Sequence, residues 1–206
     1  MPNSITLVVN KKSCYYYAMN TTEILEKIKR TESPLKRQLL MVALITNLLG
    51  QKGKSAPIVI GECALSYYTR EVYFTADIDL AYSDRDALDA VLKELDFKKQ
   101  GRYWISEELK VAIEAPASAL TGEDSPVEVV EVEDNFYCRI IGIEDLIIDR
   151  LNACKYWKSE IDCEMVELLI KRYAKELDWG YLEKKGAMPD NNTAAELLEL
   201  RKKAEQ

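Results

Sequence analysis

The pattern of apolar residues changes at Gly142, and this change limits the folds that the chain can adopt. Between about residue 55 and Gly142, short apolar runs typical of strands alternate with short helical patterns. After Gly142 the apolar residues recur only at helical spacing, as in residues 143–156 and 159–176. This order predicts an α+β fold with a mixed β-sheet nucleus flanked by helices and a helical C-terminal cap.

We therefore expect three segments in the 206-residue chain. Residues 1–54 form a helical extension packed on the core, residues 55–142 form the α/β core, and residues 143–206 form the helical region. The helices expected outside the core are 21–30, 34–49, 143–156, 159–176, 178–185 and one that begins at Thr193. Within the core we expect strands at 57–60, 73–82, 96–99, 101–105, 109–115, 127–132 and 136–141, and helices at 63–68 and from Ser83 to about 95. A weak alternation also predicts a strand within residues 5–18.

Local signals place the helix ends. Ser33-Pro34 is a helix start with proline in the first turn, and Gly50 is expected to end that helix. The pairs Ser83 with Asp86 and Thr193 with Glu196 have the spacing of capping boxes.

The chain contains no histidine, and this excludes several kinds of active site. Ser-His-Asp triads, Cys-His dyads and His-ligated zinc all require that residue. Catalysis would have to use carboxylates, Lys, Arg, Ser, Thr, Tyr or Cys. The five cysteines are odd in number and form no CxxC pair, so we expect small buried side chains in a reducing cytoplasm and no disulfide framework.

Charge and hydropathy disfavour two further kinds of partner, nucleic acids and membranes. The formal net charge is −7, which disfavours non-specific binding to nucleic acid. The longest apolar run, residues 39–49, is shorter than the ~20 residues that cross a bilayer. We therefore expect neither a membrane span nor a long nucleic acid as partner.

Asp77-Ile78-Asp79 is the segment most suggestive of chemistry. On a strand, side chains at i and i+2 point to the same face, so both aspartates would stand side by side while Ile78 points into the core. Like charges this close repel unless a cation lies between them. Carboxylates of this kind suit Mg²⁺, which binds one or two of them together with substrate phosphates.

Two further features surround this pair. Gly61 ends an apolar strand and opens a helix, and the free backbone N–H groups of a helix N-terminus bind phosphate. Glu114 lies on the strand expected at 109–115, on the face opposite to that of Val111 and Ile113, and would complete a three-carboxylate cluster. Three carboxylates with two metal ions suit in-line phosphoryl or nucleotidyl transfer.

These residues resemble the nucleotidyltransferase fold of the DNA polymerase β-like superfamily. The resemblance rests on Gly61 at a strand end, a short helix, the Asp77-Ile78-Asp79 strand and Glu114 at the position of the third metal carboxylate. Residues 142–153 followed by Asp162 are similar to a stretch in stand-alone and abortive-infection toxin-type nucleotidyltransferases. The resemblance covers about residues 55–180.

The resemblance implies a metal-dependent nucleotidyltransferase that moves NMP from an NTP to a hydroxyl acceptor and releases pyrophosphate. It implies that Asp77, Asp79 and Glu114 are catalytic and bind Mg²⁺ or Mn²⁺. The implied nucleotide-binding residues are Gly61, Glu62, Ser66, Arg70, Arg150, Lys155 and Asp162. The net charge favours a small-molecule or protein hydroxyl as acceptor, and the toxin-type resemblance adds an antitoxin as a candidate partner and leaves self-association open.

The sequence departs from this family in the nucleotide site. Glu62 stands where the family has a small or hydroxyl residue, and Arg150 stands where the toxin-type enzymes have lysine. Trp157 and Ile161 replace basic residues. A catalytically degenerate module that binds a nucleotide or a protein partner is therefore the alternative, and a structural α+β protein is a third reading.

The remaining basic residues of the core have a structural reading. Lys98, Lys99 and Arg102 gather on the expected hairpin at 96–105. We expect them to be a solvated edge that discourages pairing with further strands.

Overall fold

A computed structural model describes residues 21–122 and 124–204. It shows a mixed α+β fold with a seven-stranded sheet and, in the described part, eight helices. The helices are α1 (Thr21–Arg30), α2 (Pro34–Gln51), α3 (Gly61–Thr69), α4 (Arg85–Glu94), α5 (Ile143–Trp157), α6 (Glu160–Tyr173), α7 (Trp179–Gly186) and α8 (Ala194–Ala204). The strands are β1 (Ile58–Ile60), β2 (Asp77–Ala81), β3 (Lys98–Gln100), β4 (Tyr103–Ser106), β5 (Val111–Ala117), β6 (Val127–Glu133) and β7 (Phe136–Ile141). The strand predicted within residues 5–18 lies outside the described residues.

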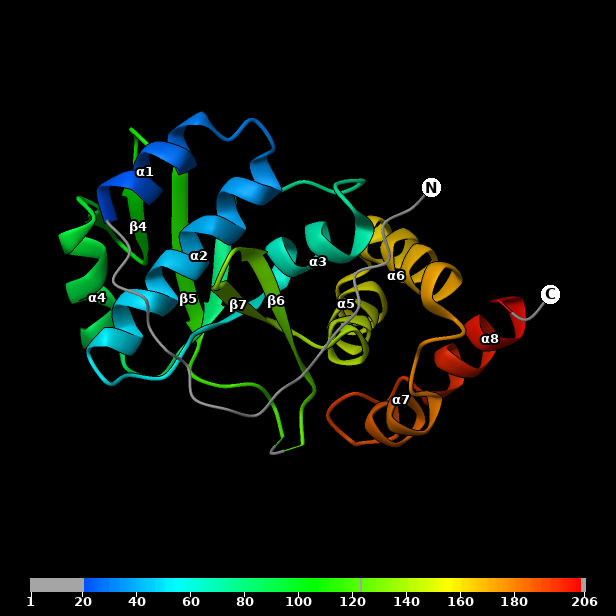
Figure 1. Ribbon diagram of the computed structural model, residues 1–206. Helices are drawn as coiled ribbons and strands as arrows, with labels where there is room; N and C mark the ends of the chain where they lie inside the picture. The colour runs from blue at the N-terminus through cyan, green and yellow to red at the C-terminus, as the bar shows by residue number, and fades with distance from the viewer. Residues whose placement is uncertain (1–20, 123, 205–206) are drawn as a thin grey trace.

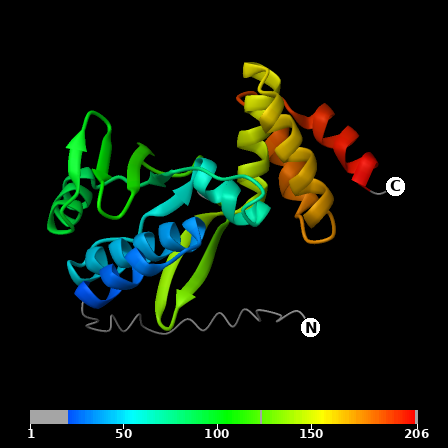
Figure 2. The ribbon, with the colours of Figure 1, turned by 90° about the horizontal axis from the view of Figure 1, so that it is seen from above.

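The sheet has the order β3-β4-β5-β2-β1-β7-β6. The parallel pairs are β1 with β7 and β2 with β5, and the other neighbours are antiparallel. Helices α1, α2 and α4 lie on one side of this sheet, and α5 to α8 form a lobe beside it (Figures 1 and 2). The expected fold class is confirmed.

Alternation along the strands divides the sheet into two unlike faces. Val59, Ile78, Leu80 and Ile113 are completely buried and share the core with α2, from which Leu40, Met41, Val42 and Ile45 are also completely buried. On the other face, Ile58 and Ile60 of β1 and Asp77 and Asp79 of β2 are only partly buried, whereas Ala81 is buried. The second face therefore carries polar side chains and is the open face of the sheet.

Several element ends differ from the prediction. β2 begins at Asp77, so the predicted strand at 73–82 was too long. Asp84 caps α4 through a hydrogen bond from the Ala87 N–H (3.0 Å), so the Ser83 assignment was wrong by one residue. Ser33 does cap α2, but this helix continues through Gly50. Thr193 makes no side-chain hydrogen bond in the described structure, so its predicted capping box does not form.

Both apolar and polar contacts attach the helical lobe to the core, and residues of α5 and α6 belong to the same buried apolar cluster as those of α3. Arg172 and Tyr173 of α6 donate hydrogen bonds to the Tyr68 carbonyl at the end of α3 (3.2 and 2.9 Å). Lys185 of α7 contacts the loop after β5 through Thr121 and Ser125. No helix among the described residues is both long and apolar enough to cross a membrane.

The structure corrects one prediction about the cysteines. Cys154 of α5 and Cys163 of α6 form a disulfide, whereas all the cysteines were expected to be unpaired. The sequence could not show this, because the pairing depends on how the two helices fold back on each other. Cys63 and Cys138 are free and buried, as predicted, and Cys14 lies outside the described residues.

Candidate active site

Three acidic residues lie on two neighbouring strands of the open face of the sheet. Asp77 and Asp79 lie on β2, and the register of β2 with β5 places Glu114 directly opposite Asp79. We call Asp77, Asp79 and Glu114 the acidic edge. The parallel pairing of two strands far apart in the sequence thus brings together the residues predicted to form the catalytic cluster.

Gly61 allows the acidic edge and the start of α3 to approach closely. Its φ is +60°, and a Cβ at this position would lie 2.4 Å from Asp79 Oδ2. The next N–H, that of Glu62, donates to the same Asp79 oxygen (3.3 Å). Asp79 thus lies against the N-terminus of α3, the part of the molecule where an anion is favoured.

Asp79 is in a demanding electrostatic environment. Burial raises its pKa, and the charges of Asp77, Glu114 and Glu62 raise it further, while the hydrogen bond from the Glu62 N–H opposes the shift. The unfavourable charge would be relieved by a cation between the carboxylates. An excess of negative charge of this kind is expected at a site that binds a divalent metal ion.

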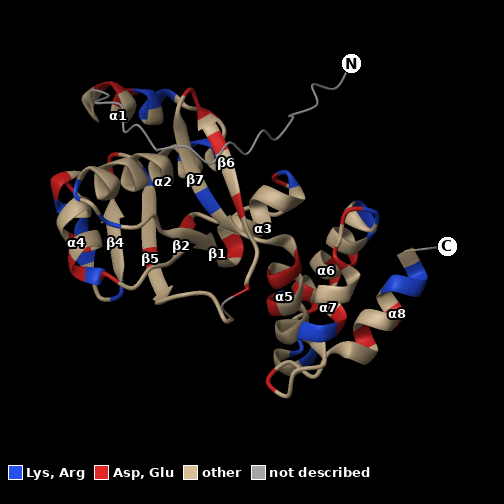
Figure 3. Cartoon of the chain, turned by 60° about the horizontal axis from the view of Figure 1, so that its bottom comes forward, with Lys and Arg blue, Asp and Glu red and all other residues tan. Residues whose placement is uncertain are grey.

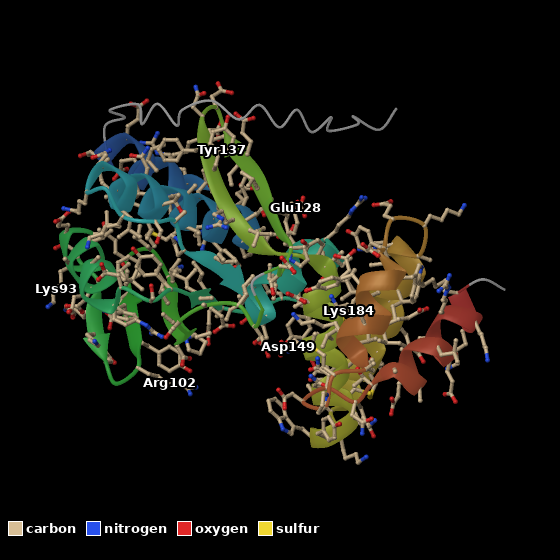
Figure 4. All side chains as sticks on the ribbon, turned by 90° about the horizontal axis from the view of Figure 1, so that it is seen from below. Lys93, Arg102, Glu128, Tyr137, Asp149 and Lys184 are labelled. Carbon is tan, nitrogen blue, oxygen red and sulfur yellow. A yellow bond between two sulfur atoms is a disulfide. The ribbon has the colours of Figure 1, made fainter. Side chains whose placement is uncertain are left out.

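Glu114 already has a cationic partner. Its side chain is 11% exposed, and its Oε2 lies 3.3 Å from Nε of Arg102. Arg102 also donates to the Tyr103 hydroxyl (2.7 Å) and stacks over that ring. Figure 4 labels Arg102 on the β3–β4 hairpin and Asp149 on α5.

Arg102 is the functional candidate that sequence reasoning missed. It was expected to be part of a solvated edge, and β3 is indeed an edge strand. The missing information was the β4–β5 register, which pairs Tyr103 with Glu114 and so brings the adjacent Arg102 to the carboxylate. The hairpin signal at Gly101 was visible, but its pairing with β5 was not.

A second group of charges faces the site from the helical lobe. Arg150 of α5 forms an ion pair with Asp162 of α6 (3.1 Å) and another with Asp149 (2.7 Å). We call Arg150 and Asp162 the helical wall. Burial opposes the charged form of Arg150, but the charges of Asp149 and Asp162 raise its pKa, and the charge of Glu62 adds a smaller contribution.

Tyr73 connects Glu62 with the helical wall. Burial raises the pKa of Tyr73 to about 12, with further contributions from the charge of Glu62, a hydrogen bond with that carboxylate and the charge of Asp162. Glu62 therefore lies between the acidic edge and the helical wall. In Figure 3 acidic residues colour β2, the start of α3 and the adjoining α5.

The structure does not bring three other predicted residues to this place. Ser66 is completely buried in the middle of α3, where its hydroxyl has no hydrogen-bond partner. Arg70 follows the far end of α3, roughly 13 Å from Gly61 at 1.5 Å per residue. Lys155 points to the other side of the lobe, where it contacts Glu196 (2.9 Å) and the carbonyl of Asn192.

The donor set fits a hard divalent cation only in part. Carboxylate oxygens are the ligands that Mg²⁺ prefers, and Asp77 with Asp79 supplies the one or two that it needs beside phosphates. Among residues 21–122 and 124–204, however, no three Asp, Glu or Cys side chains lie in a preformed metal-binding arrangement. The ion pair of Glu114 with Arg102 is consistent with this, because it directs the third carboxylate toward the guanidinium.

Comparison with known proteins adds little. No family model matches the chain, and no curated protein matches it in sequence. A solved structure with a similar arrangement is the antibiotic-resistance factor ANT(2'')-Ia, with 14% identity over 77% of this chain and 88% of that chain. Its TM-score is 0.42, a level that does not by itself establish a shared family.

Proposed function

We propose that this chain is a metal-dependent nucleotidyltransferase that moves NMP from an NTP to the hydroxyl of an acceptor. The observation that carries the proposal is the acidic edge: two carboxylates on β2 and a third opposite them on β5, beside a glycine that opens a helix. This arrangement brings oxygen ligands and backbone N–H groups to one place. Both are required to hold a triphosphate with its counter-ion.

Asp77 and Asp79 would hold Mg²⁺ or Mn²⁺ between them and the phosphates. When bound, the cation would neutralise charge on the phosphates and lower the pKa of the acceptor hydroxyl. The raised pKa of Asp79 supports this role, because ionised Asp79 is held in an environment that favours a nearby positive charge. Glu114 would also bind the cation once its ion pair with Arg102 is broken. The Arg102 guanidinium would then be free to bind a phosphate.

The reaction is an in-line displacement at the α-phosphorus. The acceptor oxygen forms a bond to the α-phosphorus. The bond between the α-phosphorus and the oxygen that bridges the α- and β-phosphates breaks. Pyrophosphate leaves with the electron pair, and the acceptor proton passes to Glu114 and then to solvent. The backbone N–H groups after Gly61 would orient the β- and γ-phosphates, since they lie at the start of α3.

Pyrophosphate release tests this proposal. The parent protein, Asp77→Asn and the matched control Asp86→Asn would be incubated with Mg²⁺ and each of the four NTPs, with a mixture of small hydroxyl compounds as acceptors. Asp86 is an exposed first-turn residue of α4, on the opposite face of the sheet. We expect release by the parent and the control and a loss of at least 100-fold in Asp77→Asn. Equal rates in all three proteins would contradict the proposal.

The second candidate is a catalytically degenerate module that binds a nucleotide or a protein partner. Glu62 supports it, because a carboxylate at the start of α3 adds negative charge where phosphates would bind. In that case Glu62→Ser should increase NTP affinity without producing pyrophosphate. Pyrophosphate release by the parent would rule this candidate out.

A further inference from the structure

A cavity of about 280 Å³ adjoins the acidic edge on the open face of the sheet. Ile58, Ala81 and Arg139 lie in one row across β1, β2 and β7, and all three line the cavity. Ile60 and Asp79 form the next row on the same face. Two residues along a strand span about 7 Å, so the cavity and the acidic edge are neighbouring parts of one surface.

Arg139 is the charged residue of this cavity. It is partly buried, and its guanidinium makes no ion pair or hydrogen bond with any residue in the described part of the chain. A guanidinium that is partly removed from water normally has an anionic partner, because burial without one costs free energy. The other cations near the site, Arg102 and Arg150, have theirs.

The other residues around Arg139 are neutral. Hydroxyl groups come from Ser55, Ser83 and Ser118, and the cavity contains no acidic residue among those described. This composition is the opposite of the acidic edge next to it. One surface thus offers a place for a cation at the carboxylates and a place for an anion beside it.

We propose that this cavity binds an anionic group of the acceptor, a phosphate or a carboxylate, while the acceptor hydroxyl lies at the acidic edge. This proposal rests on the proposed nucleotidyltransferase function and adds the chemical class of the acceptor. Arg139 binds such a group through two parallel N–H···O bonds, and the serine hydroxyls supply further hydrogen bonds.

The dimensions indicate a small molecule. Arg139 and Asp79 are separated by one strand, β1, which corresponds to roughly 10 Å across the sheet and about 7 Å along it. A cavity of about 280 Å³ is close to the lower limit of typical ligand pockets. A metabolite bearing one anionic group and one hydroxyl fits this span.

Binding of inorganic phosphate and of acetate tests the cavity directly, without catalysis. Both would be titrated by calorimetry into the parent, Asp77→Asn, Arg139→Gln, Arg139→Lys and the control Arg30→Gln, which lies exposed on α1. We expect phosphate or acetate to bind the parent, Asp77→Asn and Arg30→Gln with equal affinity. Binding to Arg139→Gln should be at least tenfold weaker, and Arg139→Lys should have an intermediate affinity. Unchanged binding to both Arg139 variants, or no binding to the parent, would overturn the proposal.

Titration with NTP in the presence of Mg²⁺ shows whether the cavity binds the acceptor or the nucleotide. If the cavity holds the acceptor, Arg139→Gln binds NTP as tightly as the parent does, and phosphate does not compete with NTP. Weaker NTP binding to Arg139→Gln would instead assign the cavity to the triphosphate and overturn the acceptor assignment. If the parent binds no NTP, the proposed function fails, and the phosphate and acetate titrations still decide whether the cavity is an anion site.

Discussion

Gly61 is the residue that permits the close approach of α3 to the acidic edge. Any side chain here must adopt a φ of +60° and also place a Cβ 2.4 Å from Asp79 Oδ2. We predict that Gly61→Ala lowers the free energy of unfolding by roughly 2–5 kcal/mol, the sum of backbone strain and overpacking. Urea unfolding measures this loss.

Gly53→Ala is the matched control for that substitution. Gly53 also has a positive φ, +69°, but no heavy atom lies within 4 Å of the place that a Cβ would occupy there. It should therefore show only the backbone cost of about 1 kcal/mol. Equal losses in the two variants would show that Asp79 does not lie against Gly61.

Asp79 gives a pH-dependent prediction at the same scale. Its raised pKa means that the folded protein binds a proton more readily than the unfolded chain does, so stability falls as the pH rises from the ordinary value of 3.8 through the raised one. Asp79→Asn removes this penalty and keeps an oxygen to accept from the Glu62 N–H. We predict a higher melting temperature than the parent at pH 7 without metal, and a difference that narrows toward pH 4.

The same melting curves would be recorded for Asp86→Asn. Asp86 is exposed on α4, outside the acidic edge, so its variant should follow the parent at every pH. A lower melting temperature of Asp79→Asn at pH 7 would mean that the Asp79 charge stabilises the metal-free protein, contrary to our interpretation.

At the scale of elements, Lys185 connects α7 with both α5 and the loop after β5. Its Nζ lies 3.1 Å from Asp145, and both side chains are at most 10% exposed. Lys185→Met would leave Asp145 buried with the Tyr181 hydroxyl as its one side-chain partner among the described residues (2.7 Å). We predict a loss of about 3–5 kcal/mol, the usual cost of breaking a buried pair.

The double variant Lys185→Met/Asp145→Leu is the appropriate comparison. Removal of both charges leaves no unpaired buried ion, so much of the lost stability should return. If the double variant instead loses as much free energy of unfolding as the two single variants together, Lys185 and Asp145 do not interact. Both variants are compared with the parent by urea unfolding.

The disulfide links the two longest helices of the lobe. Cys154 and Cys163 are nine residues apart, and closure of a loop of this length stabilises by roughly 2–3 kcal/mol in the chain-entropy model. We predict that dithiothreitol lowers the stability of the oxidised parent by this amount. The double variant Cys154→Ala/Cys163→Ala should be insensitive to the reductant, and a parent that is equally insensitive would contradict the bond.

At the scale of the whole molecule, local patterns predicted the elements well, but contacts between elements could not be predicted. Capping residues and apolar periodicity predicted the strands at 127–132 and 136–141, which pair as β6 and β7, and the helices after Gly142. These signals depend on neighbours in the sequence. They missed the Asp84 cap by one residue, because Ser83 and Asp84 are both good caps.

The candidate site shows the same division. Asp77 and Asp79 could be paired from strand geometry alone, and Glu114 from the phase of its strand. The contact of Arg102 with Glu114 required the β4–β5 register, and the cavity at Arg139 required the parallel pairing of β1 with β7. Lys155, which the sequence placed at the site, is drawn away because α8 packs on the other side of the lobe.

The account depends most on divalent-metal binding by the acidic edge. Mn²⁺ titration monitored by electron paramagnetic resonance counts bound ions directly, in the presence and absence of an NTP. We predict weak binding by the parent alone, binding at least tenfold tighter with NTP, and loss of both in Asp77→Asn and Asp79→Asn but not in Asp86→Asn. Mn²⁺ binding that is absent from the parent with every NTP, or that persists unchanged in both acidic-edge variants, would contradict the account.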